Sequence, residues 1–212
     1  MSDSHEYFAT RMAPHRARST VWRHVARYLR RYIDPNGALL DLAAGYGDLT
    51  GAVEAHRRVA IDIHPDLARL VPDNVEAHVG DATDLTRFAD GEFATVTASN
   101  FLEHLDDAGI DRCLEEVRRV LRNGGHLILI QPNHRLCEKS YFDDPTHVTV
   151  FDDTLLVQRV SAAGFEVVRT EPRFLPLTLK SRLSAGAKLT PIYLRLPWRP
   201  LAGQMLVVAR RP

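Results

Sequence analysis

The chain has 212 residues, which is enough for one domain with a sizeable core. Its 25% charged and 45% hydrophobic residues are typical of a soluble globular protein. No apolar run approaches the ~20 residues that cross a bilayer, so we expect no transmembrane segment. The N-terminus lacks the apolar stretch of a secretory signal. We therefore expect a cytoplasmic protein, in which Cys113 and Cys137 are free thiols.

The net charge of zero conceals an uneven distribution of charge along the chain. Residues 7–33 hold seven Arg, residues 172–212 hold eight Lys or Arg, and neither stretch holds an acidic residue. Residues 34–171 hold 12 basic and 25 acidic residues, which gives them a net charge of −13. Two interpretations remain open. The basic ends either neutralise the acidic middle, or one of them faces an anionic acceptor or a membrane surface.

Short β-rich runs alternate with helical runs, which indicates a parallel sheet with crossover helices. The first predicted element is an amphipathic helix from Ser19 to Ile33, followed by the turn-forming sequence DPNG. Two later helices are predicted from about Ile110 to Leu121 and from Asp152 to Ala163. Strands are predicted at residues 38–42, 58–61, 75–79, 93–98, 126–130, 165–170 and 204–210.

The loop after the first strand carries the strongest chemical signal. The sequence LLDLAAGYGDLT, residues 39–50, runs from a buried strand ending in Asp41 through a turn with Gly45 and Gly47 into a predicted helix. Glycine lets the backbone turn tightly and approach a ligand closely. In open α/β folds, ligands bind at the carboxyl edge of the sheet, where this loop lies.

The loops after the next two strands also carry acids. Asp62 ends the second strand, 21 residues after Asp41, where its carboxylate can accept hydrogen bonds from both hydroxyls of a ribose. Asp81 ends the third strand, where it can reach the exocyclic amine of adenine, and Ala82 can offer its backbone amide. Each loop alone also fits an ordinary turn or cap, but three in succession indicate a nucleotide site. A dinucleotide fingerprint would place a third glycine where the chain has Thr50.

These loops belong to a larger resemblance. Together with FATVTASNFLEHL, EEVRRVLRNGGHLILIQPN, AAGFEVV and MLVVARR, they resemble class I S-adenosylmethionine-dependent methyltransferases over roughly residues 36–171. The resemblance implies a single Rossmann-like α/β domain. Its seven-stranded, mostly parallel sheet would have the order 3-2-1-4-5-7-6, an antiparallel last strand, and helices on both faces. The predicted parts are an N-terminal helical segment (1–37), a cofactor-binding core (38–171), an inserted segment (172–203) and a final strand (204–212).

The resemblance also implies S-adenosylmethionine as the cofactor. It places Gly45 and Gly47 beside the methionine part, Asp62 on the ribose, and Asp81 with Ala82 on the adenine. The remaining predicted cofactor-binding residues lie in or beside the same loops: Asp41, Ala43, Ile63 and Asn100. Ala43 stands where the family usually has its first loop glycine. Because alanine tolerates most conformations that are not left-handed, we expect a narrowed loop that still binds the cofactor.

Two segments at the same edge are candidates for catalysis. After the fourth strand, His104 is a possible general base, although it would equally serve as a structural cap. After the fifth strand, Tyr141, Asp143, Asp144 and His147 form a second group, for which turn and cap chemistry is the alternative. We assign no metal ligands. A divalent ion such as Mg²⁺, bound by Asp143, Asp144 and His147, is an alternative.

The predicted reaction is methyl transfer to a small-molecule acceptor, with the hydroxyl of a saccharide or other polar metabolite favoured. N- or C-methylation of a lipid or secondary metabolite and a non-catalytic cofactor-binding protein are alternatives. We expect no nucleic-acid partner, because the acidic middle would repel phosphates, and a monomer or homodimer. Residues 173–203 are expected to form a lid or wall over the acceptor. A dimer surface, a peripheral membrane contact and plain packing are the other possibilities.

Overall fold

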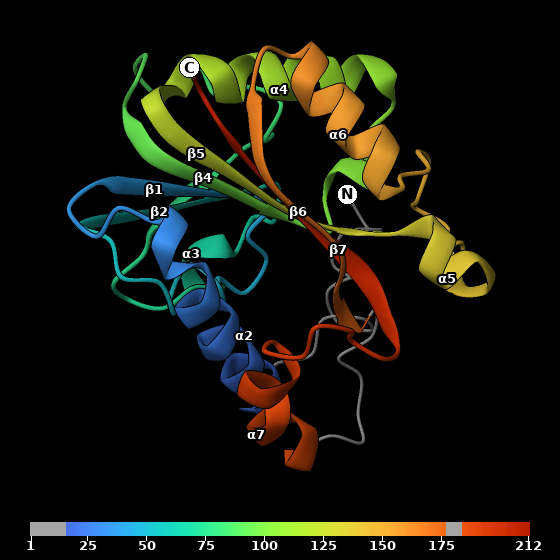
Figure 1. Cartoon of the computed structure of the whole chain (residues 1–212). Helices are drawn as coiled ribbons and strands as arrows, with labels where there is room; N and C mark the ends of the chain where they lie inside the picture. The colour runs from blue at the N-terminus through green and yellow to red at the C-terminus, as the bar shows by residue number, and fades with distance from the viewer. Residues whose placement is uncertain (1–15, 177–183) are drawn as a thin grey trace.

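A seven-stranded sheet organises the computed structural model, which describes residues 16–176 and 184–212 (Figure 1). The strands are β1 (Ala38–Leu42), β2 (Arg57–Asp62), β3 (Glu76–Val79), β4 (Phe93–Ser99), β5 (Leu121–Pro132), β6 (Glu166–Pro176) and β7 (Ala202–Arg210). Their order across the sheet is β3-β2-β1-β4-β5-β7-β6, and β7 runs antiparallel to both of its neighbours. The predicted fold class and strand order are therefore confirmed.

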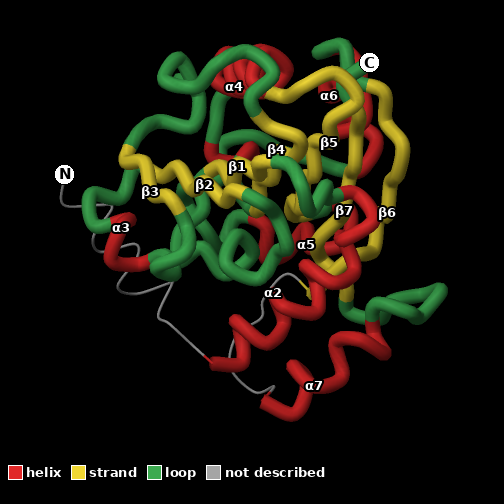
Figure 2. The backbone as a smooth tube through the Cα atoms, turned by 90° about the vertical axis from the view of Figure 1, so that its left-hand side faces the viewer, coloured by secondary structure: helices red, strands yellow, loops and turns green. Residues whose placement is uncertain are grey.

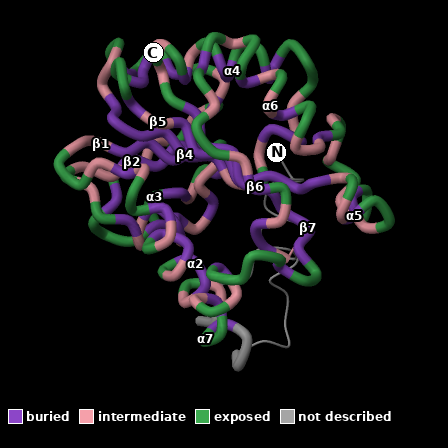
Figure 3. Tube along the Cα trace, viewed as in Figure 1, coloured by how far each residue is buried: buried purple, intermediate pink, exposed green. Residues whose placement is uncertain are grey.

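The central strands are apolar along their whole length because the sheet is covered on both faces. Alternate side chains of one strand enter different cores: Leu40 and Leu42 of β1 join one cluster, and Leu39 joins the other. The same alternation separates Leu129 from Ile130 in β5. Figure 3 shows the result, with buried positions running through the middle strands and exposed positions concentrated in the loops.

Helices α4 (Asp107–Val120) and α6 (Asp153–Ala162) cover the first face of the sheet. Their apolar stripes join the larger core, with Leu114 from α4 and Leu156 from α6 both buried. Aspartates cap both helices, since Asp106 accepts a hydrogen bond from the Gly109 amide and Asp152 accepts two from the first turn of α6. The predicted helices at these places are confirmed.

Helices α2 (Arg16–Leu29) and α7 (Ser184–Tyr193) lie side by side on the other face, as two views show (Figures 1 and 2). Val25 and Leu29 of α2 share the second core with Ala187 of α7 and with Phe174 of β6. Residues 30–32 follow α2 as a short 3-10 turn, η1 (Arg30–Tyr32). The connection from β6 to β7 therefore contributes a packed helix, in line with the packing alternative. Its residues 177–183, like residues 1–15 of the predicted N-terminal segment, lie outside the described part of the chain.

The helix predicted after the first loop was wrong. Residues 48–53 form consecutive turns, in which the Gly51 amide bonds to the Gly47 carbonyl at 2.7 Å. Only 14 residues separate β1 from β2, and they must supply both the loop and the crossover. Close packing reinforces this restriction, because a Cβ on Gly51 would lie 2.6 Å from Cγ of Pro72.

Other elements differ from the prediction in extent. Strand β6 continues to Pro176 because its last residues still pair with β7, through Pro176 and Ala202. Strand β5 begins at Leu121, which pairs with Phe93 of β4. Short helices that the sequence pattern did not predict are α3 (Leu67–Leu70), η2 (Leu102–His104) and α5 (His134–Tyr141). Over residues 16–176 and 184–212, no helix has the length and apolarity that a membrane crossing needs.

Basic side chains from both ends of the chain pair with acids of the middle. Arg18 lies 2.7 Å from Asp48, and Arg199 lies 2.5 Å from Glu171. The fold thus brings the ends back to the acidic core, as the first of the two charge interpretations expects.

Candidate functional site

The loops after β1 and β2 are tied together at the carboxyl edge of the sheet. Asp62, the last residue of β2, accepts a hydrogen bond from the Gly45 amide and another from the His64 amide, both at 2.9 Å. The side chain is almost completely buried. Each carboxylate oxygen can accept a second hydrogen bond, so Asp62 combines a structural role with spare capacity for a ligand.

Asp41 supports the same loop from within the core. Its carboxylate accepts hydrogen bonds from the hydroxyls of Thr50 and of Thr97, the latter at 2.7 Å. Burial raises the pKa of Asp41 to about 6, although the two hydroxyl donors act in the opposite direction. Thr50, which replaces the third glycine of a dinucleotide fingerprint, therefore anchors the loop to β1.

The backbone of the first loop turns left-handed three times. The φ angles are 50° at Ala43, 56° at Gly45 and 62° at Gly47. The expectation that Ala43 avoids this region was wrong, because the loop keeps the conformation that suits glycine although a Cβ is present. At Gly47 the space is also tight, since a Cβ would lie 3.0 Å from Cγ1 of Val71.

The other predicted cofactor-binding residues lie around these loops. Ile63 follows Asp62 and exposes 64% of its surface, whereas Ala82 is buried. Asp81 is exposed and accepts hydrogen bonds from the amide and hydroxyl of Thr83, which closes a local turn. Asn100 follows β4 with a φ of 50°, and its side-chain oxygen accepts a 2.6 Å bond from Gln204 of β7.

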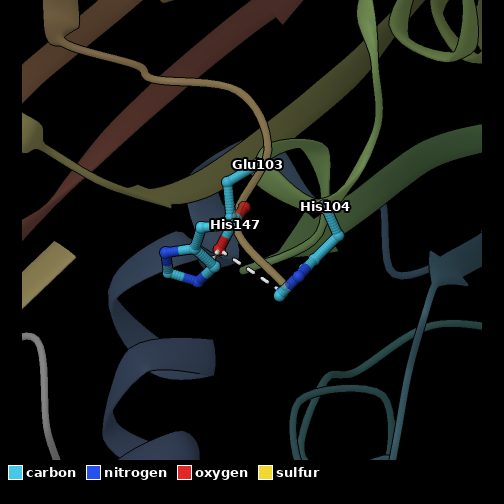
Figure 4. Close-up of side chains that lie close together, drawn as sticks. All are labelled: Glu103, His104 and His147. Atoms are coloured by element: carbon cyan, nitrogen blue, oxygen red, sulfur yellow. Dashed lines mark ion pairs between the residues drawn. The ribbon is translucent and has the colours of Figure 1, made fainter. Parts of the chain in front are cut away.

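A cluster of three titratable side chains lies beyond the end of β4. The Nε2 atoms of His104 and His147 are 4.0 and 3.9 Å from Oε1 of Glu103, and the two imidazole rings meet edge to face at 4.9 Å (Figure 4). Backbone hydrogen bonds hold the segments together, because the amides of Val148 and Thr149 both donate to the Glu103 carbonyl. The turn η2 and the segment after α5 thus form one site.

His104 is oriented by hydrogen bonds at its other ring nitrogen. Nδ1 lies 3.2 Å from the Thr146 carbonyl and 2.9 Å from its hydroxyl, which in turn donates to Asp144 at 2.6 Å. A carbonyl only accepts, so Nδ1 carries the proton and Nε2 offers its lone pair to the cluster. Burial, reinforced by the neighbouring His147, lowers the pKa of His104.

Residues 40–129 match a family of proteins described as "Methyltransferase domain". The match begins in β1 and ends in β5, so it includes the tied cofactor loops and the turn that carries Glu103 and His104. The chain belongs to the class I family of S-adenosylmethionine-dependent methyltransferases. The predictions of this family and of an enzyme of the transferase class are thereby confirmed.

The methyltransferase also resembles individual proteins. Over 113 residues it is 34% identical to the ubiquinone/menaquinone biosynthesis C-methyltransferase UbiE of Hydrogenovibrio crunogenus, which covers 47% of this chain and 43% of that protein. The matched region is thus less than half of the relative's length. A methyltransferase of Archaeoglobus fulgidus shares the fold, with a TM-score of 0.71, 18% identity and full coverage of both chains. The [4+2]-cyclase SpnF also shares it, with a TM-score of 0.62, 21% identity, and coverage of 90% of this chain and 80% of SpnF.

Glu103 is the functional candidate that the sequence prediction missed. Its side chain is fully buried, and within the described residues neither carboxylate oxygen has a hydrogen-bond partner. Burial raises the pKa of Glu103 to about 8, and the negative charge of Asp144 acts in the same direction. The available signal was an acid directly before His104, in an otherwise apolar FLEHL segment.

The predicted second catalytic group of the methyltransferase is only partly brought together. His147 joins the cluster, and Asp144 reaches it through Thr146. Tyr141 packs its ring 5.0 Å from that of His147, but its hydroxyl donates to the Thr149 carbonyl and accepts from the Phe151 amide. Burial raises the pKa of this hydroxyl. Asp143 is exposed and lies outside the Glu103, His104 and His147 group.

Proposed function

We propose that this methyltransferase transfers the methyl group of S-adenosylmethionine to a small molecule that carries a hydroxyl group. The main support is the hydrogen bond between Gly45 and Asp62, which joins the two cofactor loops at the edge where the Glu103, His104 and His147 cluster also lies. A nucleotide cofactor and a group that handles protons are both needed for such a reaction.

The residues of the cofactor loops suit the proposed cofactor. The spare lone pairs of the Asp62 carboxylate can accept hydrogen bonds from ribose hydroxyls, and the exposed Ile63 beside it offers an apolar surface for adenine. We assign Gly45 and Gly47 to the methionine part and Asp81 with Ala82 to the adenine. When bound, the cofactor supplies an electrophilic methyl carbon on a positively charged sulfur. The protein contributes mainly alignment.

The acceptor hydroxyl must lose its proton during transfer. A lowered pKa keeps His104 neutral near pH 7, and its Nε2 is the nitrogen that faces the cluster. His147 is the second candidate base, with Glu103 between them. Asp144 acts on His104 through Thr146, and it orients the imidazole rather than touching the acceptor.

The molecule that carries the hydroxyl is either a polar metabolite such as a saccharide or a phenolic ring. The phenolic alternative is favoured by the similarity to UbiE, whose name describes it as a C-methyltransferase of ubiquinone and menaquinone biosynthesis. Methylation of a ring carbon beside a phenol also gains from removal of the hydroxyl proton. The same cluster therefore serves both outcomes, which differ in the atom that receives the methyl group.

A direct test offers labelled S-adenosylmethionine to the purified chain with panels of saccharides, phenols, hydroquinones and amines. Transfer to a hydroxyl-bearing acceptor is expected, and the carbon shift of the new methyl group in NMR separates O- from C-methylation. Transfer to amines alone would contradict the hydroxyl proposal. Cofactor binding by calorimetry without turnover on any panel would favour the non-catalytic alternative, and absence of binding would overturn the proposal.

A further inference from the structure

We propose that Glu103, His104 and His147 bind a divalent transition-metal ion of the zinc and iron(II) class. The three side chains each offer one ligand atom, and these atoms lie within 4.8 Å of one another (Figure 4). In a tetrahedral site with bonds of about 2.1 Å, ligand atoms are about 3.4 Å apart. The Nε2 to Oε1 distances of 3.9 and 4.0 Å are close to this value, so small side-chain movements complete the site.

The buried carboxylate of Glu103 is the observation that most needs a cation. Among the described residues, both of its oxygens lack a hydrogen-bond donor, although the side chain is fully buried. Burying an ionised carboxylate without a partner is costly, and metal coordination is one of the ways in which proteins compensate it. A divalent ion between the carboxylate and the two imidazoles would satisfy Glu103 without any rearrangement of the fold.

The surroundings of His104 match those of a metal ligand. Its Nδ1–H donates toward the Thr146 carbonyl, which fixes the tautomer in which Nε2 is unprotonated. Ligating histidines almost always use their second nitrogen in this way, and such outer contacts raise the basicity of the ligand. The Thr146 hydroxyl, itself bonded to Asp144, braces the same nitrogen. The acidic residue thus belongs to the support of the site rather than to its ligands.

The ligand chemistry selects the class of metal. Two imidazoles with one carboxylate suit zinc and iron(II), whereas Mg²⁺ and Ca²⁺ prefer sites made of oxygen ligands. The oxygen-rich set of Asp143, Asp144 and His147, considered from the sequence, is not the group that the fold assembles. Three protein ligands also leave a coordination position for water or substrate. The His104 side chain, 23% exposed, gives the cluster contact with solvent.

The catalytic use of this ion rests on the proposed function. An acceptor hydroxyl that coordinates the ion becomes more acidic, so its proton leaves to solvent and its oxygen becomes the nucleophile. The imidazoles then act as ligands instead of bases. The binding of the metal itself requires neither acceptor nor cofactor, and it can be tested separately.

The test is a titration of chelator-treated, metal-free protein with Co²⁺, followed by visible absorption, and then displacement by Zn²⁺. We expect one ion per chain. Glu103→Gln and His147→Gln should each weaken binding at least about 100-fold, since loss of a ligand exceeds the loss of an outer contact. The matched control is His56→Gln, because His56 is an exposed histidine outside the cluster, and its affinity should equal that of the wild type.

Two controls keep the outcomes distinct. Circular dichroism and S-adenosylmethionine binding establish that Glu103→Gln is folded, and Thr146→Val offers a milder variant with an expected loss of about 10-fold. Absence of saturable 1:1 binding would overturn the metal site, as would equal affinity in Glu103→Gln, His147→Gln and the wild type. Methyl transfer that persists in metal-free protein would remove the ion from the reaction and leave the proposed function intact.

Discussion

The two edges of the sheet differ in where they place strained backbone. At the carboxyl edge, left-handed conformations occur at residues with a Cβ: Ala43, Asn100 and Leu201, with φ of 50°, 50° and 58°. At the amino edge the left-handed positions are glycines: Gly91, Gly124 and Gly164. A left-handed alanine or leucine costs roughly 1–2 kcal/mol, which glycine avoids. The molecule therefore accepts strain mainly at the edge that carries the cofactor loops.

Charges show the same contrast. At the amino edge, Arg57 pairs with Glu76 and Glu92, and Arg119 pairs with Glu116. At the carboxyl edge, Glu103 is buried without a hydrogen bond from the described residues. Strained or unsatisfied groups persist only where other interactions maintain them, and they concentrate at functional sites. The comparison thus separates a structural edge from a functional one.

The largest expected effect comes from the histidines of the functional edge. His104→Ala and His147→Ala should each reduce turnover by about 10²–10⁴-fold, the range that loss of an acid–base group produces. Affinity for S-adenosylmethionine should change little, because neither histidine lies in the loops that join Gly45 to Asp62. Steady-state rates with calorimetry measure both quantities. Near-normal turnover in both variants would remove the cluster from the reaction.

The next effect concerns a charge at the carboxyl edge that is paired. Arg199 donates to Glu171 and to the carbonyls of Arg173 and Leu194, and both charged side chains are buried. Arg199→Met should lower the free energy of unfolding by about 3–5 kcal/mol, since it leaves Glu171 buried without its main partner. Arg210→Met is the matched control. Its partner Glu166 is exposed, so a loss below about 1 kcal/mol is expected.

Urea denaturation distinguishes these two variants. Equal losses would show that burial does not separate paired charges at the two edges in the way described. A loss of turnover in folded Arg199→Met, without a change in stability, would instead place Arg199 in the site.

Asp62 tests the cofactor loops. Asp62→Ala should weaken S-adenosylmethionine binding by about 1.5–3 kcal/mol for each hydrogen bond lost to ribose, or roughly 10- to 150-fold. Part of the loss would come from the released Gly45 amide. Calorimetry on the folded variant is the measurement, and Asp73→Ala, in an exposed turn, serves as the control. Unchanged affinity would remove Asp62 from the site.

The buried carboxyl of Asp41 predicts a dependence of stability on pH. Because its pKa is raised from 3.8 to about 6, the folded state holds a proton that the unfolded state releases. The resulting stabilisation is complete below pH 3.8 and is lost as the pH rises through 6. Asp41→Asn should remove up to about 3 kcal/mol of this change. Parallel pH profiles for both proteins in urea denaturation would contradict it.

Much of the fold followed from local pattern, whereas the site depended on distant contacts. The apolar strands and the Asp106 and Asp152 caps are encoded within a few residues, and the three cofactor loops follow successive strands. Glu103 became a candidate only because η2 meets a segment more than 40 residues later, through its carbonyl and the Val148 amide. The turns after β1 replaced a predicted helix because of spacing and of Pro72, which no amphipathic pattern reveals.

Ala43 offers the smallest and most specific test of the strained edge. A left-handed alanine costs roughly 1–2 kcal/mol, while the extra freedom of glycine in the unfolded chain costs about 0.5–1 kcal/mol. Ala43→Gly should therefore stabilise the protein by about 0.5–1 kcal/mol in urea denaturation. Ala44→Gly, at the next residue and without a positive φ, should destabilise it by a similar amount. If Ala43→Gly is more stable but binds S-adenosylmethionine less tightly, the strain holds the loop ready for the cofactor. Stabilisation with unchanged affinity would show that the loop binds equally well without it, and destabilisation would contradict the strain itself.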